Sequence, residues 1–419
     1  MVLSGSRIII ESLLAQGVDT VFGYPGGAIM PLYDALYDAP IKHILTVHEQ
    51  GAAHAADGYA RASGKVGVCI ATSGPGATNL VTGLATAFMD SSPIVAITGQ
   101  VGTSLLGRDA FQEIDITGLT MPITKHNFLV RNIKELAKTI ADAFRIASTG
   151  RPGPVLIDVP RDILLAETDF VPINPAMTLQ DSSELKSTVP DDSVKQAASM
   201  LARAKRPILL TGGGAVIANA SAPLSDLCRM ANLPVVSTLM GLGALPSNMP
   251  YYLGLTGMHG HKAANMAVAA SDLLVAVGTR FSDRITGDRL RYAEGKTIIH
   301  LDIDRAEIDK NIGADICLDG DLNQSLANLA LHFAKLRQTD RTDWLQQISN
   351  WQNTHQENCD NTTLNPIWLM RHMSAAAANN PVLWITDVGQ HQMWAAQHLE
   401  IKHPRTWLTS GGLGTMGFG

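Results

Sequence analysis

The chain has 419 residues, which predicts roughly three domains at about 150 residues each. Hydrophobic residues make up 46% and charged residues 17% of the sequence, a composition that excludes intrinsic disorder over most of the chain. The formal net charge is -6 and no basic run occurs, which argues against a nucleic-acid partner. No apolar stretch approaches the ~18 residues that span a bilayer. Four scattered cysteines without CxxC spacing indicate a reducing, cytoplasmic compartment.

The first predicted domain covers residues 1–165 and alternates candidate strands with helical patterns. It opens with an amphipathic helix ending at Gly17. Because Arg7 and Glu11 interrupt the apolar part of this helix, we do not expect a secretory signal peptide. Strand–turn–helix repeats of this kind predict a parallel sheet. Its strands are expected at Thr20–Gly23, 43–47, 66–72, 93–99 and 154–159.

The rest of the chain repeats the same rhythm after a Pro-rich, polar linker predicted at 166–192. A second domain is expected at 193–340, a connecting segment at 341–365 with a polar helix near 343–356, and a third domain at 366–419. The sequence therefore predicts an α/β fold of three parallel-sheet domains, the third incomplete. The further expected strands are Pro207–Thr211, 234–238, Leu273–Val277, 297–303, 381–386 and 407–409.

Glu49 stands directly after the predicted strand at 43–47, ahead of a helix expected at 52–62. The carboxyl ends of strands form the ligand crevice of open α/β sheets, so a buried glutamate there is a candidate acid–base group. The alternative is a carboxylate that is merely stabilised by the N-terminus of the following helix. Position alone favours that alternative.

Three glycine-rich turns also follow predicted strands, at 24–28, 72–79 and 212–214. Glycine lets a ligand approach the backbone, and free N–H groups at a helix start attract anions. The 72–79 turn is explained equally well as a tight turn or as a phosphate-binding loop, and the 24–28 turn alone is best explained as structural. Because two of these turns and Glu49 follow strands of one domain, a binding site there is favoured.

The second predicted domain carries weaker signals of nucleotide binding. Gly212, Gly213 and Gly214 end one predicted strand, and Asp302 and Asp304 stand at the end of the strand predicted at 297–303. A glycine turn with an acid at a later strand end is the general pattern of dinucleotide-binding sites, although the full glycine fingerprint is missing. His259 and His261 have no Cys or carboxylate at metal-ligand spacing. A nucleotide contact or solvent exposure is therefore expected for both histidines. Arg151, in a turn before the 154–159 strand, is by default a solvated residue.

Taken together, a set of strings in family order closely resembles the large catalytic subunit of acetolactate synthase, a thiamine diphosphate enzyme. The resemblance covers the whole chain and implies pyrimidine-binding, central FAD-binding and diphosphate-binding α/β domains. The strings include VFGYPGGA, VHEQGAAHAADGYARASGKVGV, ATSGPGATN, AITGQV, DAFQE, TGRPGPVLIDVP, LGLTGMHG, AVGTRFSDRITG, HLDIDRAEI, DVGQHQMWAAQH and SGGLGTMGFG.

By this resemblance, Glu49 is the catalytic glutamate, which favours the imino tautomer of the cofactor's aminopyrimidine and so the ylid that acts as electron sink. The ylid attacks pyruvate, CO2 leaves, and the two-carbon unit adds to pyruvate or 2-oxobutyrate. Phe111 and Gln112 are expected to line the substrate channel, and the 73–79 loop is expected near the pyrimidine rather than the phosphates. Further expected cofactor contacts are Tyr24, Pro25, Gly26, Gly27, Pro75, Asn79, Val388, Gly389, Gln390, His391, Gly414 and Met416.

The resemblance also implies FAD, with a structural role, because the carboligation involves no net redox change. The GMHG and TRFSDR strings favour the FAD-containing biosynthetic enzyme over its FAD-free catabolic counterpart. The matching positions are Arg151, Gly212, Gly213, Gly214, Thr238, Leu239, Met240, Gly257, Met258, His259, Gly260, Gly278, Arg280, Asp283, Arg284, Asp302, Ile303 and Asp321.

Two positions depart from the family pattern. Ser282 replaces the first acid of the usual RFDDR string, which puts one FAD contact in doubt. Arg161 stands at a position of the substrate site where the family usually has Lys. Arginine keeps the positive charge but lacks the point-like geometry of the lysine ammonium group. The family further implies a homodimer or higher oligomer, a small regulatory subunit, and a role in branched-chain amino acid biosynthesis.

Two other functions compete with this one. The first is another FAD- and thiamine-dependent 2-oxoacid enzyme of the pyruvate oxidase type; glyoxylate carboligase is disfavoured because it lacks the glutamate. The second is an inactive FAD-binding fragment. The final glycine-rich run matches a segment that continues in the family, and the Mg2+-binding element would lie beyond Gly419. We therefore expect a truncated chain with no metal ligand of its own, poor cofactor retention and little activity.

Overall fold

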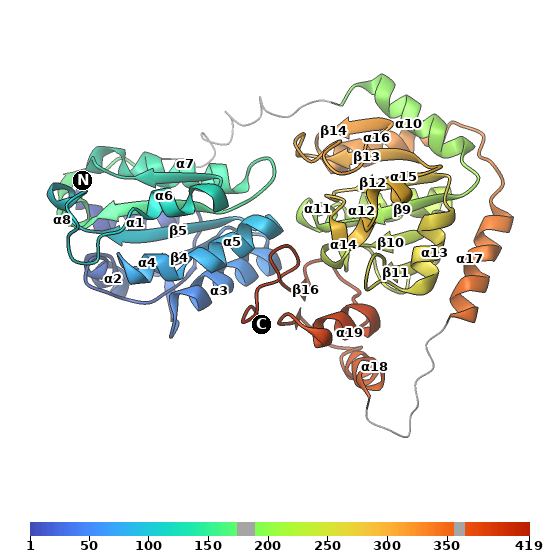
Figure 1. The fold of residues 1–419 in the computed structure, drawn as a ribbon. Helices are drawn as coiled ribbons and strands as arrows, with labels where there is room; N and C mark the ends of the chain where they lie inside the picture. The colour runs from blue at the N-terminus through green and yellow to red at the C-terminus, as the bar shows by residue number, and fades with distance from the viewer. Residues whose placement is uncertain (174–188, 356–364) are drawn as a thin grey trace. The chain divides into compact units, whose positions relative to one another are not determined.

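The computed structural model describes residues 1–173, 189–355 and 365–419. The chain forms two compact units, which we describe one at a time (Figure 1). Unit 1 comprises Met1–Leu185 with Ser410–Phe418, and unit 2 comprises Lys186–Thr409 with Gly419. The residues of the third predicted domain are thus divided between the two units.

Unit 1 is built on a six-stranded sheet of order β3-β2-β4-β5-β7-β6, and all of its pairings are parallel. The central strands are buried along their whole length because both faces are covered, as their continuous apolar sequences require. The edge strand β6 was not predicted, because its sequence HNFL is short and only partly buried. The strands are β2 (Thr20–Gly23), β3 (Lys42–Leu45), β4 (Gly67–Ala71), β5 (Ile94–Gln100), β6 (His126–Leu129) and β7 (Val155–Pro160).

Alternate residues of these strands enter two separate hydrophobic clusters. Val68 and Ile70 of β4 pack in one cluster with α1 (Gly5–Ala15), α2 (Met30–Tyr37) and α7 (Leu136–Ser148). Cys69 and Ala71 pack in the other cluster with α3 (Glu49–Ser63) and α5 (Val81–Asp90). Period-two alternation therefore distributes one strand between two helical layers.

The ends of unit 1 differ from the prediction. The first residues form strand β1 (Val2–Ser4), which pairs antiparallel with β8 (Glu167–Asp169), so the opening helix begins only at Gly5. Ser4 caps this helix by accepting a hydrogen bond from Arg7 N. The predicted linker therefore begins with a strand of unit 1, and its part at 174–188 lies outside the described residues.

Unit 2 has a second six-stranded parallel sheet, of order β11-β10-β9-β12-β13-β14. One face carries α10 (Asp191–Arg203), α12 (Ser221–Ala231) and α16 (Leu322–Phe333). The other carries α13 (Lys262–Ala270) and α17 (Thr342–Thr354), which covers most of the polar helix predicted near 343–356. The strands are β9 (Pro207–Thr211), β10 (Val235–Ser237), β11 (Tyr252–Leu255), β12 (Leu273–Val277), β13 (Thr297–Asp302) and β14 (Ile316–Asp319).

A small C-terminal part completes unit 2. Strands β15 (Trp384–Ile385) and β16 (Trp407–Leu408) pair in parallel, and α18 (Pro366–Ala376) and α19 (Gln390–His398) accompany them. The shorter helices of both units are α4 (Pro75–Asn79), α6 (Ile116–Thr120), α8 (Arg161–Leu165), α11 (Gly213–Ile217), α14 (Asp283–Thr286), α15 (Arg289–Ala293), η1 (Thr103–Leu105), η2 (Met121–Ile123), η3 (Ile133–Glu135) and η5 (Leu239–Gly241).

In each sheet the chain reverses the direction in which it adds strands beside the first strand of that sheet. In unit 1 the chain places β3 on one side of β2 and then β4 on the other side. In unit 2 it places β10 and β11 on one side of β9 and then β12 on the other side. Ligands of such sheets bind at the carboxyl ends of the strands beside this switch point. The expected crevices thus lie at β2/β4 in unit 1 and at β9/β12 in unit 2.

Candidate functional site

The two glycine turns of unit 1 meet at its switch point. Residues 24–27 follow β2, and the turn at 72–76 follows β4. Thr72 Oγ1 accepts a hydrogen bond from Ala28 N at 3.3 Å. A Cβ on Gly26 would lie 2.5 Å from Thr72 Cβ, so only glycine allows the two turns this close. The predicted residues Tyr24, Pro25, Gly26, Gly27 and Pro75 therefore lie at one edge of one sheet.

Glu49 lies at the same edge and is the first residue of α3, whereas the sequence predicted a helix starting at 52. The helix starts earlier because His48 is its N-cap, accepting a hydrogen bond from Gln50 N through Nδ1. Glu49 is only 8% exposed, and its Oε2 accepts a hydrogen bond from Asn79 Nδ2 at 2.9 Å. Both explanations of Glu49 thus find support, since the carboxylate is buried and also stands in the first turn of a helix.

Gly76 keeps the second oxygen of this carboxylate accessible. A Cβ at Gly76 would lie 3.1 Å from Glu49 Oε1, so a larger residue would press on that oxygen. Asn79 Nδ2 is the only hydrogen-bond donor to Glu49 in the part of the chain that the structure describes. The turn thereby orients one oxygen and leaves the other available to a ligand.

The predicted channel residues Phe111 and Gln112 lie on a loop that also reaches this edge. Gln112 has a φ of 59°, and its Cα would lie 2.9 Å from a Cβ on Gly74, so loop and turn are in close backbone contact. The Glu113 carboxylate shapes the loop by accepting from Gly107 N, Arg108 N and Ala110 N, which hold the pKa of Glu113 below its usual range. The Phe111 side chain is 88% exposed.

A buried polar group that sequence reasoning missed supports this loop. Asp158 of β7 accepts hydrogen bonds from Thr98 Oγ1 at 2.7 Å and from Gln100 Nε2 at 2.9 Å, and the same Gln100 nitrogen donates to Ile114 O. Burial raises the pKa of Asp158 to about 7, against the opposing effect of these two donors. An aspartate inside an otherwise apolar predicted strand was the available signal.

The two predicted arginine sites of unit 1 have different surroundings. Arg151 Nε donates to Ser91 Oγ at 2.8 Å and is partly buried, so it is more than a solvated turn residue. Arg161 is exposed and begins α8 directly after β7, at the carboxyl edge of the sheet. Arg151 lies in a different unit from the other residues expected to bind FAD.

In unit 2 the glycine turn after β9 packs against the end of β12 at the switch point. Gly212 N donates to Val277 O at 2.9 Å, and Gly214 N donates to Gly278 O at 3.0 Å. A Cβ on Gly214 would lie 2.7 Å from Gly278 Cα. These glycines are therefore required first by contact between two backbone segments, which the sequence pattern alone did not reveal.

The other positions expected to bind FAD follow the carboxyl ends of neighbouring strands. Thr238 follows β10 and caps η5, which contains Leu239 and Met240. After β11, Met258 N donates to Arg284 O, and Arg284 Nη1 donates to Met258 Sδ at 3.2 Å. The structure thus brings these residues to one edge of the unit 2 sheet. Also there, or directly after these strands, are Gly257, His259, Gly260, Arg280, Asp283, Asp302, Ile303 and Asp321.

The acids at this edge already bind their own backbone. Asp302 Oδ1 accepts from Asp304 N at 2.9 Å, and Asp321 caps α16 by accepting from Gln324 N at 2.9 Å. Ser282, which stands where the family usually has an acid, is the N-cap residue of α14 without a side-chain cap bond.

The predicted cofactor residues of the third domain are divided between the units. Val388, Gly389, Gln390 and His391 follow β15 and lead into α19 in unit 2, with Asp387 Oδ1 accepting from Val388 N at 2.7 Å. Gly414 and Met416 belong to the segment Ser410–Phe418 of unit 1. Met416 is 76% exposed there.

Metal-binding clusters and membrane-spanning helices are both absent from the described residues. Across 1–173, 189–355 and 365–419, no three His, Cys, Asp or Glu side chains gather so that they could hold a metal ion. Within the same residues, no helix combines the length and the hydropathy that crossing a membrane requires.

Comparison with known proteins places the chain beside thiamine-dependent enzymes. The thiamine pyrophosphate enzyme N-terminal TPP binding domain matches residues 3–119, the central domain 194–329, and the C-terminal TPP binding domain 387–419. The chain is 49% identical over its whole length to the acetolactate synthase isozyme 2 large subunit of Escherichia coli, spanning 74% of that protein.

Two further relatives come from distant organisms. The probable acetolactate synthase large subunit of Methanocaldococcus jannaschii is 49% identical over all of this chain, which spans 72% of that protein. Acetolactate synthase of Mycobacterium bovis is 47% identical over 99% of this chain, which spans 68% of it.

Proposed function

The chain belongs to the acetolactate synthase large subunits, a family of thiamine diphosphate enzymes, and on this premise we propose how its residues serve that reaction. The enzyme decarboxylates pyruvate and transfers the remaining two-carbon unit to a second 2-oxoacid, either pyruvate or 2-oxobutyrate. The products are precursors of the branched-chain amino acids. The observation that carries the proposed roles is the buried, half-satisfied Glu49 carboxylate at the switch point of unit 1.

The residues at this edge suit thiamine diphosphate. When bound, the cofactor supplies a carbon nucleophile and an electron sink. Glu49 would bind its aminopyrimidine through Oε1, the oxygen that Asn79 leaves unused, and would hold a proton at that atom. Because the carboxylate is buried, a hydrogen bond to it is worth more than one in water. Tyr24, Gly26 and Gly27 would contact the same ring.

The loop with Phe111 and Gln112 would cover the substrate side of this site. The close approach of Gln112 to Gly74 fixes the loop beside the turn, and the Glu113 carboxylate fixes its shape. Arg161 offers a permanent positive charge at the same edge for the carboxylate of a 2-oxoacid. Gln100 Nε2 donates hydrogen bonds both to Asp158 and to Ile114 O, and so ties this loop to the buried part of the sheet.

We place FAD along the carboxyl edge of the unit 2 sheet. Its strand order is that of dinucleotide-binding sheets, and its glycine turn stands at the switch point, where such cofactors bind. Thr238, Met258, Arg284 and Asp302 would contact it. The flavin would have a structural role, because the overall reaction transfers no electrons. Mg2+ would accompany the cofactor diphosphate, as it usually accompanies phosphates.

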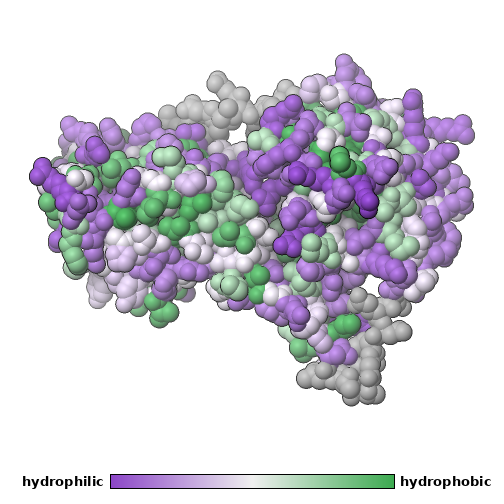
Figure 2. All heavy atoms as spheres, in the orientation of Figure 1, coloured by the Kyte–Doolittle hydropathy of each residue, from purple (hydrophilic) through white to green (hydrophobic). Residues whose placement is uncertain are grey.

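We also propose a homodimer or higher oligomer working in the cytoplasm with a small regulatory subunit. The relatives' designation as large subunits supports the regulatory partner. Unit 1 exposes large apolar side chains, Val47 at 99% and Phe111 at 88% among them, which is typical of a surface that is covered in an assembly. In Figure 2 hydrophobic residues gather on the visible face of unit 1.

The test is to incubate the purified chain with pyruvate, thiamine diphosphate, Mg2+ and FAD, and to measure acetolactate after its conversion to acetoin. Acetolactate should form without oxygen uptake, and Glu49→Gln should lower its rate of formation by about 10²- to 10⁴-fold. Glu11→Gln, an exposed glutamate of α1, is the matched control and should keep full activity. Oxygen consumption would indicate a pyruvate oxidase instead, and flavin binding without acetolactate would indicate an inactive fragment.

A further inference from the structure

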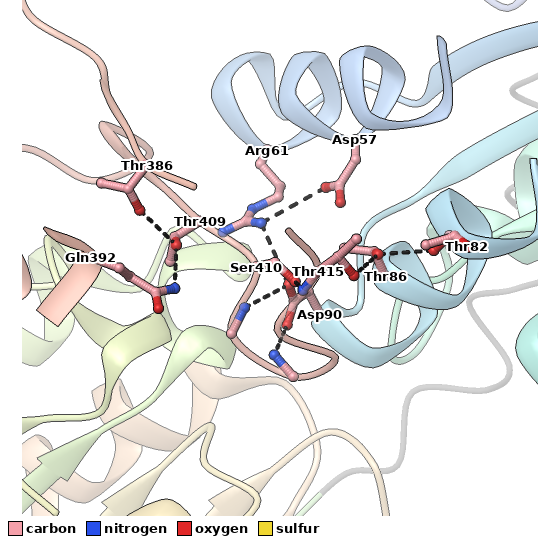
Figure 3. Close-up of polar contacts among 12 residues, drawn as sticks. Asp57, Arg61, Thr82, Thr86, Asp90, Thr386, Gln392, Thr409, Ser410 and Thr415 are labelled. Atoms are coloured by element: carbon pink, nitrogen blue, oxygen red, sulfur yellow. Dashed lines mark hydrogen bonds and ion pairs between the residues drawn. The ribbon is translucent and has the colours of Figure 1, made fainter. Parts of the chain in front are cut away.

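The glycine-rich run Ser410–Phe418 lies against α3 and α5 of unit 1, over a group of charged side chains made of two buried aspartates and a partly buried arginine (Figure 3). This group consists of Asp57 and Arg61 on α3 and Asp90 at the end of α5. None of the three was singled out by sequence motif. On α3, Arg61 lies far from Glu49, since a separation of twelve positions spans about 18 Å of helix.

Asp90 binds the run through its backbone. One carboxylate oxygen accepts from Gly411 N at 3.1 Å and the other from Gly412 N at 2.7 Å. A Cβ on Gly412 would lie 2.8 Å from Met89 Cβ, so glycine is needed for this approach. An aspartate that takes two consecutive N–H groups fixes both the position and the direction of the run at this point.

The hydroxyl groups nearby fix the next part of the run. Thr86 Oγ1 of α5 and Thr415 Oγ1 lie 2.7 Å apart, and Ser410 Oγ accepts from Thr415 N at 2.9 Å (Figure 3). The run therefore closes on itself between Ser410 and Thr415 while it is tied to the helix. Met416 follows directly, with its side chain exposed.

Arg61 supports Asp90 and also contacts the end of the run. Its Nη1 lies 3.7 Å from Asp90 Oδ2 and 3.9 Å from Asp57 Oδ1, and its guanidinium lies over the Phe418 ring at 5.5 Å from the ring centre. The His54 ring meets the same phenyl ring edge-on, 5.4 Å away. A planar guanidinium suits both contacts better than an ammonium would.

We infer that Asp90 and Arg61 are positioning residues, which hold the run Ser410–Phe418 on unit 1 so that Gly414 and Met416 are presented to thiamine diphosphate. This rests on the proposed function, because the cofactor contact of Gly414 and Met416 is itself part of that proposal. Asp90 holds the start of the run at Gly411 and Gly412, Thr86 holds Thr415, and Arg61 contacts Phe418 at its end. The exposed Met416 side chain then projects from a backbone that is held on both sides.

The decisive experiment compares the wild-type chain with Asp90→Asn, which keeps the shape but loses one acceptor and the charge. Amide hydrogen exchange of the peptide 410–419, measured without cofactor, should become at least about tenfold faster, because two charge-assisted hydrogen bonds weaken. The dissociation constant of thiamine diphosphate, from tryptophan fluorescence, should rise about tenfold, while kcat at saturating cofactor changes less than about twofold.

Asp142→Asn is the matched control, because Asp142 is an ion-paired aspartate on α7 of the same unit. It should change neither measurement. Unchanged exchange in Asp90→Asn, or an equal effect in Asp142→Asn, overturns the inference. If circular dichroism shows that Asp90→Asn does not fold, the isosteric Thr86→Val decides: faster exchange around Thr415 supports the inference and unchanged exchange overturns it.

The exchange measurement separates this inference from the proposed function. A wild-type chain that forms no acetolactate would remove the proposed function, while faster exchange in Asp90→Asn would still show that Asp90 holds the run. Faster exchange with an unchanged thiamine diphosphate affinity would instead show a purely structural contact and overturn the positioning role.

Discussion

Each unit is built on a sheet of six parallel strands, yet the carboxylates at the carboxyl edges of the two sheets have different hydrogen-bond partners. In unit 1, the buried Glu49 carboxylate accepts a hydrogen bond from the Asn79 side chain, and within the described residues it accepts none from a backbone N–H group. In unit 2, Asp302 and Asp321 both accept hydrogen bonds from neighbouring backbone N–H groups. A carboxylate with an unused buried oxygen can do chemistry, whereas one bound to backbone N–H groups orders a surface.

The glycines of the two crevices differ in the same way. Gly76 in unit 1 leaves space beside Glu49 Oε1, whereas Gly214 in unit 2 leaves space for another backbone segment. The carboxylate of Glu49 in unit 1 therefore suits the reacting group that we propose, and the acids of unit 2 suit the cofactor-binding edge that we propose. Three changes test this difference and a fourth, Asp57→Asn, tests a buried acid of unit 1 outside its crevice; they follow in order of decreasing effect.

Glu49→Gln should have the largest effect. Glutamine keeps the size and the contact with Asn79 but cannot hold a proton as a carboxylate does, so kcat should fall by about 10²- to 10⁴-fold. Steady-state acetolactate formation measures this, with Glu11→Gln as control. A loss below about threefold would remove the distinction between the two crevices.

Gly212→Ala should break the unit 2 crevice without touching unit 1. The added methyl group would collide with the Gly278 backbone, which should destabilise the fold by about 1–3 kcal/mol and abolish flavin binding. Flavin absorbance after gel filtration and a thermal melt check both effects. Gly313→Ala, with open space around its Cβ position, should leave both unchanged.

Asp57→Asn should change how stability depends on pH. Burial raises the pKa of Asp57 from 3.8 to about 6, while Arg61 lowers it and Asp90 raises it. Between these values the folded chain binds more protons than the unfolded chain, so stability should fall as pH rises from about 4 to about 6. Asparagine should remove this loss and raise the melting temperature at pH 7 but not at pH 4.

Thermal melts from pH 4 to pH 7.5 measure the Asp57 effect. Part of the slope should persist in the variant, because the pKa of Asp158 is raised to about 7 in the same unit. A variant melting profile that parallels the wild type over the whole range would show that Asp57 does not titrate in this window.

Ser282→Asp should have the smallest effect. An aspartate at the N-cap of α14 would add a side-chain cap and a favourable charge at a helix start, worth about 0.5–1 kcal/mol. Flavin titration should therefore show a change in affinity of less than about fivefold. A larger gain would mean that the missing acid contacts the flavin directly.

The central strands could be predicted because their apolar runs are long and end in glycine turns. Thr20–Gly23, Pro207–Thr211 and Leu273–Val277 were predicted with the bounds that the structure shows. The edge strands β6, β11 and β14 were not, because an edge strand needs only partial burial and lacks a continuous apolar pattern.

The family resemblance pointed to residues, and the structure adds what surrounds them. Motifs directed attention to Glu49 and Gly212, but the sequence does not show that Asn79 donates to Glu49 or that Gly212 packs on Gly278. The sequence did not predict the group of Asp57, Arg61 and Asp90, because these residues lie up to 33 positions apart and meet only when α3 and α5 pack together. Long-range contacts of this kind carry no local signal.

The contact between Gly214 and Gly278 restricts which sequences remain open to this chain. A Cβ added at either glycine would lie 2.7 Å from the Cα of the other, so each occupies the space that a side chain on the other would need. A mutation at one position is therefore not rescued by a mutation at the other, because both add atoms to one gap. A side chain at either position therefore requires the turn after β9 and the end of β12 to move apart.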